Sequence, residues 1–178
     1  QTQDHPMFKT YAEELKWLTT DKVRMKWVAN TIKDISTSGN TLILVDRISA
    51  GQILQEQLED SVFVSGSTKN IDRKEQYDEV STATNKIIIA TYGVASVGIN
   101  IPRIFNLVLI EPGKSFVRVI QSIGRGIRKA EDKENVQIWD ITSSCKFAKR
   151  HLGARKKFYK EANYPYNIEK VNYENPYT

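Results

Sequence analysis

The sequence predicts one doubly wound α/β domain, in which helices cover both faces of a mainly parallel sheet. Short apolar, β-branched runs alternate with helix-like stretches along the chain. In three of these runs the apolar residues follow one another continuously rather than in alternation, which is typical of strands that are buried on both faces. The chain has 178 residues, which is enough for a single domain with a substantial core.

The predicted strands and helices follow one another in regular order. The strands are expected at residues 41–45, 62–64, 86–90, 105–110 and 136–140. The helices are expected at residues 21–36, 50–59, 71–80, 115–125 and 145–162. Such alternation predicts parallel strands that are joined by right-handed crossovers.

The first predicted helix, at residues 21–36, has clear start and stop signals. Thr20 or Asp21 can cap its amino end, and Gly39 and Asn40 follow its carboxyl end. Its predicted core-facing residues recur at helical spacing: Val23, Trp27, Val28, Thr31, Ile32 and Ile35.

The chain divides into three segments. Residues 1–20 are expected to form a lead-in or interdomain linker of undefined structure, residues 21–162 the domain, and residues 163–178 a C-terminal tail with four of the eight tyrosines. Cys145 is the only cysteine, which excludes an intrachain disulfide and a cysteine-based zinc site. No apolar run approaches the ~20 residues that span a bilayer, and the start lacks a signal-peptide pattern. We therefore expect a cytoplasmic protein, in the host cell if it is viral.

Small, hydroxylated and glycine-rich segments follow the predicted strands. In a parallel sheet these segments meet at one edge, where the ligands of α/β proteins bind. Each segment alone is explained by turn and cap preferences. Together they favour a phosphate-rich ligand. The segments are Asp46–Arg47, residues 65–68, residues 91–93, residues 111–115 and residues 140–143.

Gly113, Lys114 and Ser115 resemble the end of a phosphate-binding P-loop. The motif requires a glycine five residues before Gly113, but that position is Val108, inside a predicted strand. The chain also lacks an Asp-Glu pair after a strand that could hold magnesium. This segment is therefore not expected to bind a nucleoside triphosphate by itself.

The segment from Gln121 to Arg128, QSIGRGIR, is the most informative part of the sequence. Arg125 and Arg128 share one face if the segment is helical. Arginine is suited to a transferring phosphoryl group because it is planar, always charged and able to donate to two oxygens. Gly124 and Gly126 would each cost a helix about 1 kcal/mol, which argues for a special backbone role over an ordinary basic surface.

Three segments, in this order, resemble motifs of superfamily-two helicases. LILVDR at residues 42–47 resembles motif IV, ATYGVASVGINIP at residues 90–102 resembles motif V, and QSIGRGIR resembles motif VI. The chain as a whole resembles the second RecA-like domain of phage recombination and repair helicases, which are related to branch-migration enzymes.

The resemblance implies roles for individual residues. Arg125 and Arg128 would be arginine fingers that reach ATP and Mg²⁺ held by an N-terminal RecA-like domain of the same protein. Two positions depart from the common pattern: Asn100 replaces an aspartate, and Ser122 replaces an arginine. The nucleotide cleft would also contain Gln121, Gly124, Gly98 and Asn100. The nucleic-acid backbone would contact Arg47, Gly66, Ser67, Thr68 and Thr91.

Residues 146–160 contain seven Lys or Arg and no acid. A core-facing stripe at helical spacing is predicted for Phe147, His151, Ala154, Phe158 and Ala162. The cations between them are either a solvated face or a DNA contact, and the absence of acids favours DNA binding by Lys149, Arg150, Lys156 and Lys157. We expect His151 to be packed rather than catalytic, and the tail tyrosines to pack on the domain rather than on bases.

The sequence thus favours the C-terminal motor domain of an ATP-dependent DNA helicase. Its expected substrates are branched or duplex DNA, with RNA–DNA hybrids left open. The alternative is a non-catalytic nucleic-acid-binding α/β module. The two hypotheses differ in whether a P-loop-bearing partner domain produces DNA-stimulated ATP hydrolysis.

Overall fold

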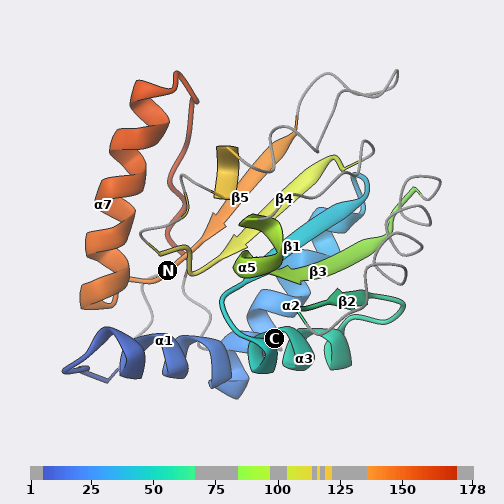
Figure 1. Ribbon diagram of the computed structural model, residues 1–178, viewed down its shortest axis with the longest axis horizontal. Helices are drawn as coiled ribbons and strands as arrows, with labels where there is room; N and C mark the ends of the chain where they lie inside the picture. Colours follow the sequence, from blue (N-terminus) through green and yellow to red (C-terminus); the bar gives the residue numbers. More distant parts are fainter. Residues whose placement is uncertain are drawn as a thin grey trace.

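The computed structural model describes residues 6–66, 84–96, 104–113, 116, 119–121 and 136–171. Within these ranges five parallel strands form one sheet in the order β2-β3-β1-β4-β5 (Figure 1). The prediction of a parallel α/β sheet is confirmed, and each predicted strand end lies within one residue of the observed one. The strands are β1 (Thr41–Val45), β2 (Val62–Val64), β3 (Ile87–Thr91), β4 (Asn106–Ile110) and β5 (Gln137–Ile141).

The sheet separates two layers of core because successive side chains of a strand point to opposite faces. In β1, Leu42 and Leu44 belong to one cluster, whereas Ile43 and Val45 belong to the other. Every residue of β1 and β4 is buried, as the continuous apolar runs predicted. β2 and β5 are the edge strands, and three residues of β5 are exposed.

Helices cover both faces of this sheet. α2 (Lys22–Ser36) and α3 (Ile48–Gln57) pack on one face, whereas α5 (Tyr92–Ser96) and part of α7 (Lys146–Glu161) pack on the other. Residues 116 and 119–121 are helical, in agreement with the predicted helix at 115–125. The predicted helix at 71–80 and the rest of 115–125 lie outside the described residues.

α2 begins where the sequence predicted, with Asp21 as its N-cap, but its buried face differs in part. The carboxylate of Asp21 accepts the N–H of Arg24 at 2.9 Å. Val23 is 39% exposed, whereas Arg24 is fully buried. The prediction placed Val23 in the core because it is apolar, but Arg24 lies on the same face as Val28 and Ile32 and has buried polar partners.

The segment before Asp21 contains a helix that the sequence did not predict. Thr10 is the N-cap of α1 (Tyr11–Thr20), and its hydroxyl accepts the N–H of Glu13 at 3.2 Å. Leu15 and Leu18 are buried, and Leu18 packs against residues that begin α7. α1 is thus part of the folded unit, whereas the expectation for residues 1–20 was an undefined lead-in. Figure 1 shows α1 near the end of α7 where that helix starts.

The predicted core stripe of α7 is wrong by about one residue. The buried residues are Ala148, His151, Arg155 and Tyr159. Ala154 is exposed, and Phe147, Phe158 and Ala162 are only half-buried. The displacement arises because Arg155, which was counted among the cations, and Tyr159, which was not considered, both donate hydrogen bonds to Asp140. The packed position of His151 is confirmed by its edge-on contact with Tyr11, with ring centroids 4.7 Å apart.

Candidate nucleotide and nucleic-acid interface

All described strands are parallel, so their carboxyl ends meet at one edge of the sheet. The register pairs Val64 with Ala90 and Val45 with Thr91. Gly66, Thr91 and Arg47 therefore lie along the ends of three neighbouring strands. The structure brings these three predicted nucleic-acid contacts together.

Arg47 is the second residue after β1 and occupies the N-cap position of α3. Its Nε donates to Oδ2 of Asp46 at 3.1 Å, and about a third of its side chain is exposed. The other oxygen of Asp46, Oδ1, is buried and has no hydrogen-bond partner within the described part of the chain.

Thr91 ends β3, and its side chain serves the short helix that follows. Its Oγ1 accepts the N–H of Val94 at 3.3 Å, and the residue is half-buried. The hydroxyl of the next residue, Tyr92, donates to the carbonyl of Ile110 at 3.0 Å. That bond joins the carboxyl ends of β3 and β4, and burial raises the pKa of Tyr92 well above its usual value.

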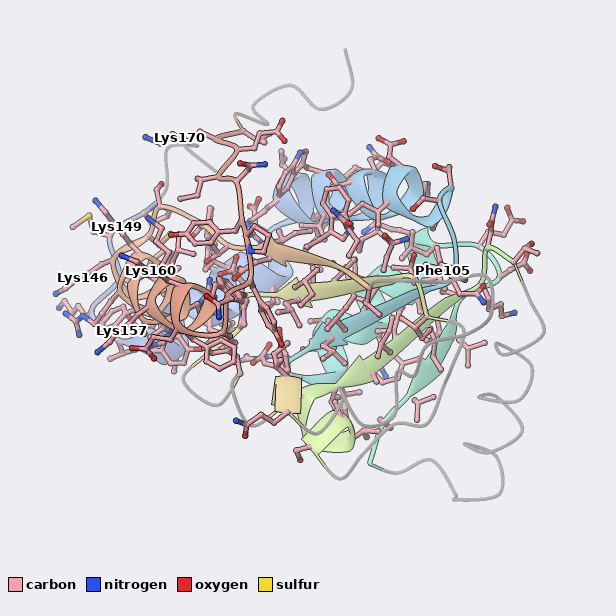
Figure 2. The ribbon with its side chains drawn as sticks, turned by 90° about the horizontal axis from the view of Figure 1, so that it is seen from above. Phe105, Lys146, Lys149, Lys157, Lys160 and Lys170 are labelled. Atoms are coloured by element: carbon pink, nitrogen blue, oxygen red, sulfur yellow. The ribbon has the colours of Figure 1, made fainter. Side chains whose placement is uncertain are left out.

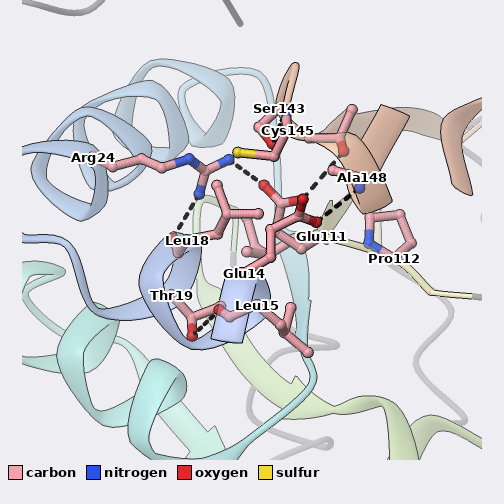
Figure 3. Close-up of polar contacts among 12 residues, drawn as sticks. Glu14, Leu15, Leu18, Thr19, Arg24, Glu111, Pro112, Ser143, Cys145 and Ala148 are labelled. Atoms are coloured by element: carbon pink, nitrogen blue, oxygen red, sulfur yellow. Dashed lines mark hydrogen bonds and ion pairs between the residues drawn. The ribbon is translucent and has the colours of Figure 1, made fainter. Parts of the chain in front are cut away.

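A buried ion pair lies at the end of β4. Arg24 of α2 donates from Nη2 to Oε1 of Glu111 and from Nη1 to the carbonyl of Leu18 at 2.8 Å (Figure 3). The hydroxyl of Thr142, just after β5, donates to Oε2 of Glu111 at 3.1 Å. Burial raises the pKa of Glu111, and the charge of Arg24 and the bond from Thr142 only partly offset this effect. Glu111 also has a left-handed backbone, with φ of 44°.

Glu14 of α1 caps a helix that is remote in sequence. Its two carboxylate oxygens accept the N–H groups of Phe147 and Ala148, each at 2.8 Å (Figure 3 shows the bond to Ala148). These are the second and third residues of α7, whose N-cap, Cys145, makes no side-chain cap bond. The first N–H groups of a helix lack partners within it, and the amino end of a helix favours a negative charge. The carboxylate of Glu14 supplies both the hydrogen-bond acceptors and the charge.

A third buried contact joins α7 to the ends of β4 and β5. Arg155 donates from Nε and Nη2 to the two oxygens of Asp140 at 2.7 and 2.9 Å, and from Nη1 to the carbonyl of Pro112 at 2.8 Å. Tyr159 donates to Asp140 at 2.8 Å. Burial alone would lower the pKa of Arg155, but the bond and charge of Asp140 raise it.

These buried polar residues were missed as site residues by sequence reasoning, although a signal was present. Arg24 and Arg155 each lie in the buried stripe of a helix, and Glu111 directly follows a strand that is buried throughout. A charged residue in a buried stripe is expected to have a buried partner. The sequence alone does not identify that partner.

The cations of α7 point away from the sheet. Lys149, Arg150 and Lys157 are exposed, and Lys156 is half-buried. Figure 2 shows Lys146, Lys149, Lys157 and Lys160 grouped around α7 on its outer side. One of the seven basic residues in the segment, Arg155, belongs to the core instead.

The structure thus separates the predicted nucleic-acid contacts into two groups. Arg47, Gly66 and Thr91 follow β1, β2 and β3, whereas the α7 cations lie beyond β5. Four strand spacings, or roughly 19 Å, separate β2 from β5.

Gln121 is exposed on its helix. The other predicted site residues lie outside the described ranges: Ser67, Thr68, Gly98, Asn100, Gly124, Arg125 and Arg128. Among the described residues, no group of three or more His, Cys, Asp or Glu could hold a metal ion. None of the helices in the described ranges is long and apolar enough to cross a membrane.

A family model, the helicase conserved C-terminal domain, matches residues 23–130, which is more than half of the chain. The chain belongs to this family. The predicted RecA-like fold is confirmed, as is the resemblance to the second motor domain of superfamily-two helicases. The matched range of this helicase C-terminal domain includes all three motifs that the sequence analysis identified.

Several viral helicases are similar to this helicase C-terminal domain. It is 30% identical over 155 residues to the ATP-dependent DNA helicase uvsW of Enterobacteria phage T4, which covers 84% of this chain and 31% of the relative. It is 28% identical over 153 residues to the putative ATP-dependent RNA helicase L396 of Acanthamoeba polyphaga mimivirus, which covers 84% of this chain and 28% of the relative. The chain thus spans less than a third of either relative.

The crystal structure of T4 UvsW has the same fold. It superimposes with a TM-score of 0.77 and 25% sequence identity, over 92% of this chain and 37% of that one. The C-terminal domain of the DEAD-box protein Dbp5 superimposes with a TM-score of 0.59 at 19% identity, over 90% of this chain and 84% of that one, and this likeness concerns the fold alone.

Proposed function

We propose that this chain is the C-terminal motor domain of an ATP-dependent DNA helicase that unwinds or branch-migrates recombination, repair and replication intermediates. The match of the helicase family over residues 23–130 carries the proposal, because that range includes Gln121, Arg125 and Arg128. The same match disfavours the alternative of a non-catalytic binding module.

Arg125 and Arg128 are proposed to act on ATP that the N-terminal RecA-like domain of the same protein holds. Their guanidinium groups would stabilise the negative charge that develops on the γ-phosphoryl group as its bond to the β-phosphate breaks. Gln121, Gly124, Gly98 and Asn100 would line the cleft. Mg²⁺ is proposed to be held, together with ATP, mainly by the N-terminal domain, as the resemblance to helicases implies.

Nucleic acid is proposed to contact two surfaces. Arg47, Gly66, Ser67, Thr68 and Thr91 would form a track for the phosphates of one strand at the carboxyl edge of the sheet. The parallel register of β2, β3 and β1 supports the position of this track at one edge of the sheet. The exposed cations of α7 would supply a second contact, through phosphates and therefore without sequence preference.

The decisive experiment substitutes Arg125 and Arg128 by alanine in the complete protein. Arginine fingers contribute roughly 10³–10⁵ in rate, so each variant should lose most DNA-stimulated ATP hydrolysis while its affinity for DNA stays nearly unchanged. Lysine at either position should not restore activity, because an ammonium cannot donate to two oxygens in one plane. Lys133→Ala, which removes a positive charge beyond the motif, is the matched control.

Full ATPase activity in both alanine variants would refute the assignment of these arginines. The isolated chain should bind ATP with at best about millimolar affinity, since Val108 stands where a P-loop needs glycine. Turnover by the isolated chain that is abolished by Lys114→Ala would contradict the assignment of ATP to another domain.

The α7 contact has a separate test. Reversing the charge of Lys149, Lys156 and Lys157 together should weaken the binding of all DNA sequences alike. The slope of log affinity against log salt should fall by about one for each lost phosphate contact. An unchanged slope would identify these residues as a solvated face.

A further inference from the structure

The end of α7 holds tyrosine rings in fixed positions. Asn163 has a left-handed backbone, with φ of 58°, and ends the helix. The N–H of Asn163 donates to the carbonyl of Lys160 at 3.2 Å, and the N–H of Tyr164 donates to the carbonyl of Tyr159 at 2.8 Å. These two bonds form a Schellman motif, so the backbone of Tyr164 is fixed relative to the helix.

Ring contacts orient the side chains further. Tyr164 meets Phe158 edge-on, with centroids 6.2 Å apart and planes at 84°, and Tyr166 lies 6.0 Å from Tyr159. Tyr164 and Tyr166 thus each contact one ring of α7, as expected of a tail that packs on the domain, but these contacts do not test whether the rings also meet bases. Yet these rings remain 43% and 47% exposed, so each is held by part of its surface and offers the rest to solvent.

The exposed rings border a shallow, open hollow of about 710 Å³. Aromatic rings and one cation dominate its lining. The residues that line it are Tyr159, Lys160, Asn163, Tyr164, Pro165 and Tyr166.

A strip of exposed cations leads along α7 to this hollow. At 100° per residue, Lys146, Lys149, Arg150, Lys157 and Lys160 fall within an arc of about 100°, and they extend along about 21 Å of helix. Gly153 lies in the middle of the strip, and a Cβ added there would meet no atom within 4 Å. A nucleic-acid backbone can therefore approach the helix closely at this point.

We propose that the hollow at the end of α7 binds an unpaired base of a single DNA strand, whose phosphates lie along the cationic strip. The inference rests on the proposed function of α7 as a nucleic-acid contact and adds which form of nucleic acid it takes. An aromatic ring stacks on the face of a base, and a duplex hides those faces between neighbouring base pairs. Tyr164 and Tyr166 thus select unpaired strands, whereas the cations alone would accept any phosphate backbone.

The test compares two single-stranded probes with equal numbers of phosphates: an oligothymidylate of about 15 nucleotides and an abasic strand of the same length. Binding to the chain is measured by fluorescence anisotropy. Stacking contributes enough per base that the oligothymidylate should bind about 5- to 150-fold more tightly than the abasic strand. Tyr164→Leu should remove most of this preference and leave the affinity for the abasic strand within about twofold. Tyr164→Phe, which keeps the ring, should bind as the parent does.

The outcomes distinguish the inference from the proposed function. If the parent binds both strands equally, with the usual salt dependence, the stacking site is refuted and the phosphate contact stands. If it binds neither strand, both fall. Because the comparison of the two probes needs no variant, a folding defect in Tyr164→Leu would not affect it. Photo-crosslinking with 5-iodouracil in place of thymine should label Tyr164 or Tyr166, and labelling confined to other residues would overturn the assignment.

Discussion

The cap that Glu14 provides for α7 makes a sharp prediction about stability. Its carboxylate accepts two N–H groups at 2.8 Å, and Glu14 is only 1% exposed. Hydrogen bonds to charged groups contribute about 1.5–3 kcal/mol each, and typical cap removals cost about 0.5–2 kcal/mol. The two bonds share one carboxylate, so their energies do not simply add. We expect Glu14→Ala to lower the free energy of unfolding by about 2–4 kcal/mol.

Urea denaturation of the chain, followed by far-UV circular dichroism, measures this change. For a domain of this size a loss of about 3 kcal/mol corresponds to a fall of roughly 6–12 °C in Tm. Glu14→Gln keeps one acceptor oxygen and removes the charge, so it should cost about half as much. In the same variants the backbone amide of Ala148, which is buried in the parent, should exchange its hydrogen faster.

Glu13 is the matched control because it is exposed and lies in the same turn of α1. Glu13→Ala should change the free energy of unfolding by less than about 0.5 kcal/mol. The reasoning is refuted if Glu14→Ala costs no more than Glu13→Ala, or if the exchange of the Ala148 amide is unchanged. Either result would mean that the carboxylate of Glu14 does not stabilise the start of α7.

Three further predictions concern packing, a buried charge and pH. Gly51→Ala should destabilise the chain by about 1–3 kcal/mol, because the added Cβ would lie 1.6 Å from the ring of Phe63. Gly153→Ala should instead stabilise it by about 0.5–1 kcal/mol, because a Cβ there meets no atom within 4 Å and alanine favours a helix over glycine. The urea midpoints of the two variants should therefore shift in opposite directions. Arg155→Met should cost about 3–5 kcal/mol, because it leaves a carboxylate without its buried partner, and a loss below 1 kcal/mol would contradict this. Burial, followed by the neighbouring carboxylate, raises the pKa of Tyr159, so this residue stays protonated in the folded state while the unfolded chain ionises near pH 10. Stability should therefore fall as pH rises above about 10, and Tyr159→Phe should flatten that fall by about 1.4 kcal/mol per pH unit in urea titrations.

The strands were predictable because their signal is local. In residues 41–45, four apolar residues follow one another after Thr41, a pattern that is typical of a strand buried on both faces. From parallel strands it followed that polar residues after each strand share an edge. This reasoning predicts that Arg47, Gly66 and Thr91 lie at one edge of the sheet, and the register of the strands agrees.

The elements that sequence reasoning missed depend on contacts between distant residues. α1 has only Leu15 and Leu18 as buried apolar residues, and its acid Glu14 is buried because α7 offers two N–H groups more than 130 residues later. The core stripe of α7 was displaced for the same reason, since Arg155 is buried with its partners Asp140 and Pro112, which come from other elements. A periodicity rule counts such residues as solvent-facing, and no local pattern names their partners.

The buried polar contacts converge on the short segment between β4 and the helix that contains Gln121. α2 holds Glu111 through Arg24, the end of β5 holds the same carboxylate through Thr142, and α7 holds the next residue, Pro112, through Arg155. The left-handed backbone of Glu111 costs of order 1–3 kcal/mol, and such strain persists only where surrounding contacts over-determine it. Phosphoryl transfer depends on donors held within about 0.5 Å of their productive positions. Under the proposed function, contacts from α2, the end of β5 and α7 therefore fix Glu111 and Pro112, which precede the segment that contains Arg125 and Arg128. A loosened contact at Glu111 should then reduce ATP turnover in the complete protein more than it reduces DNA affinity.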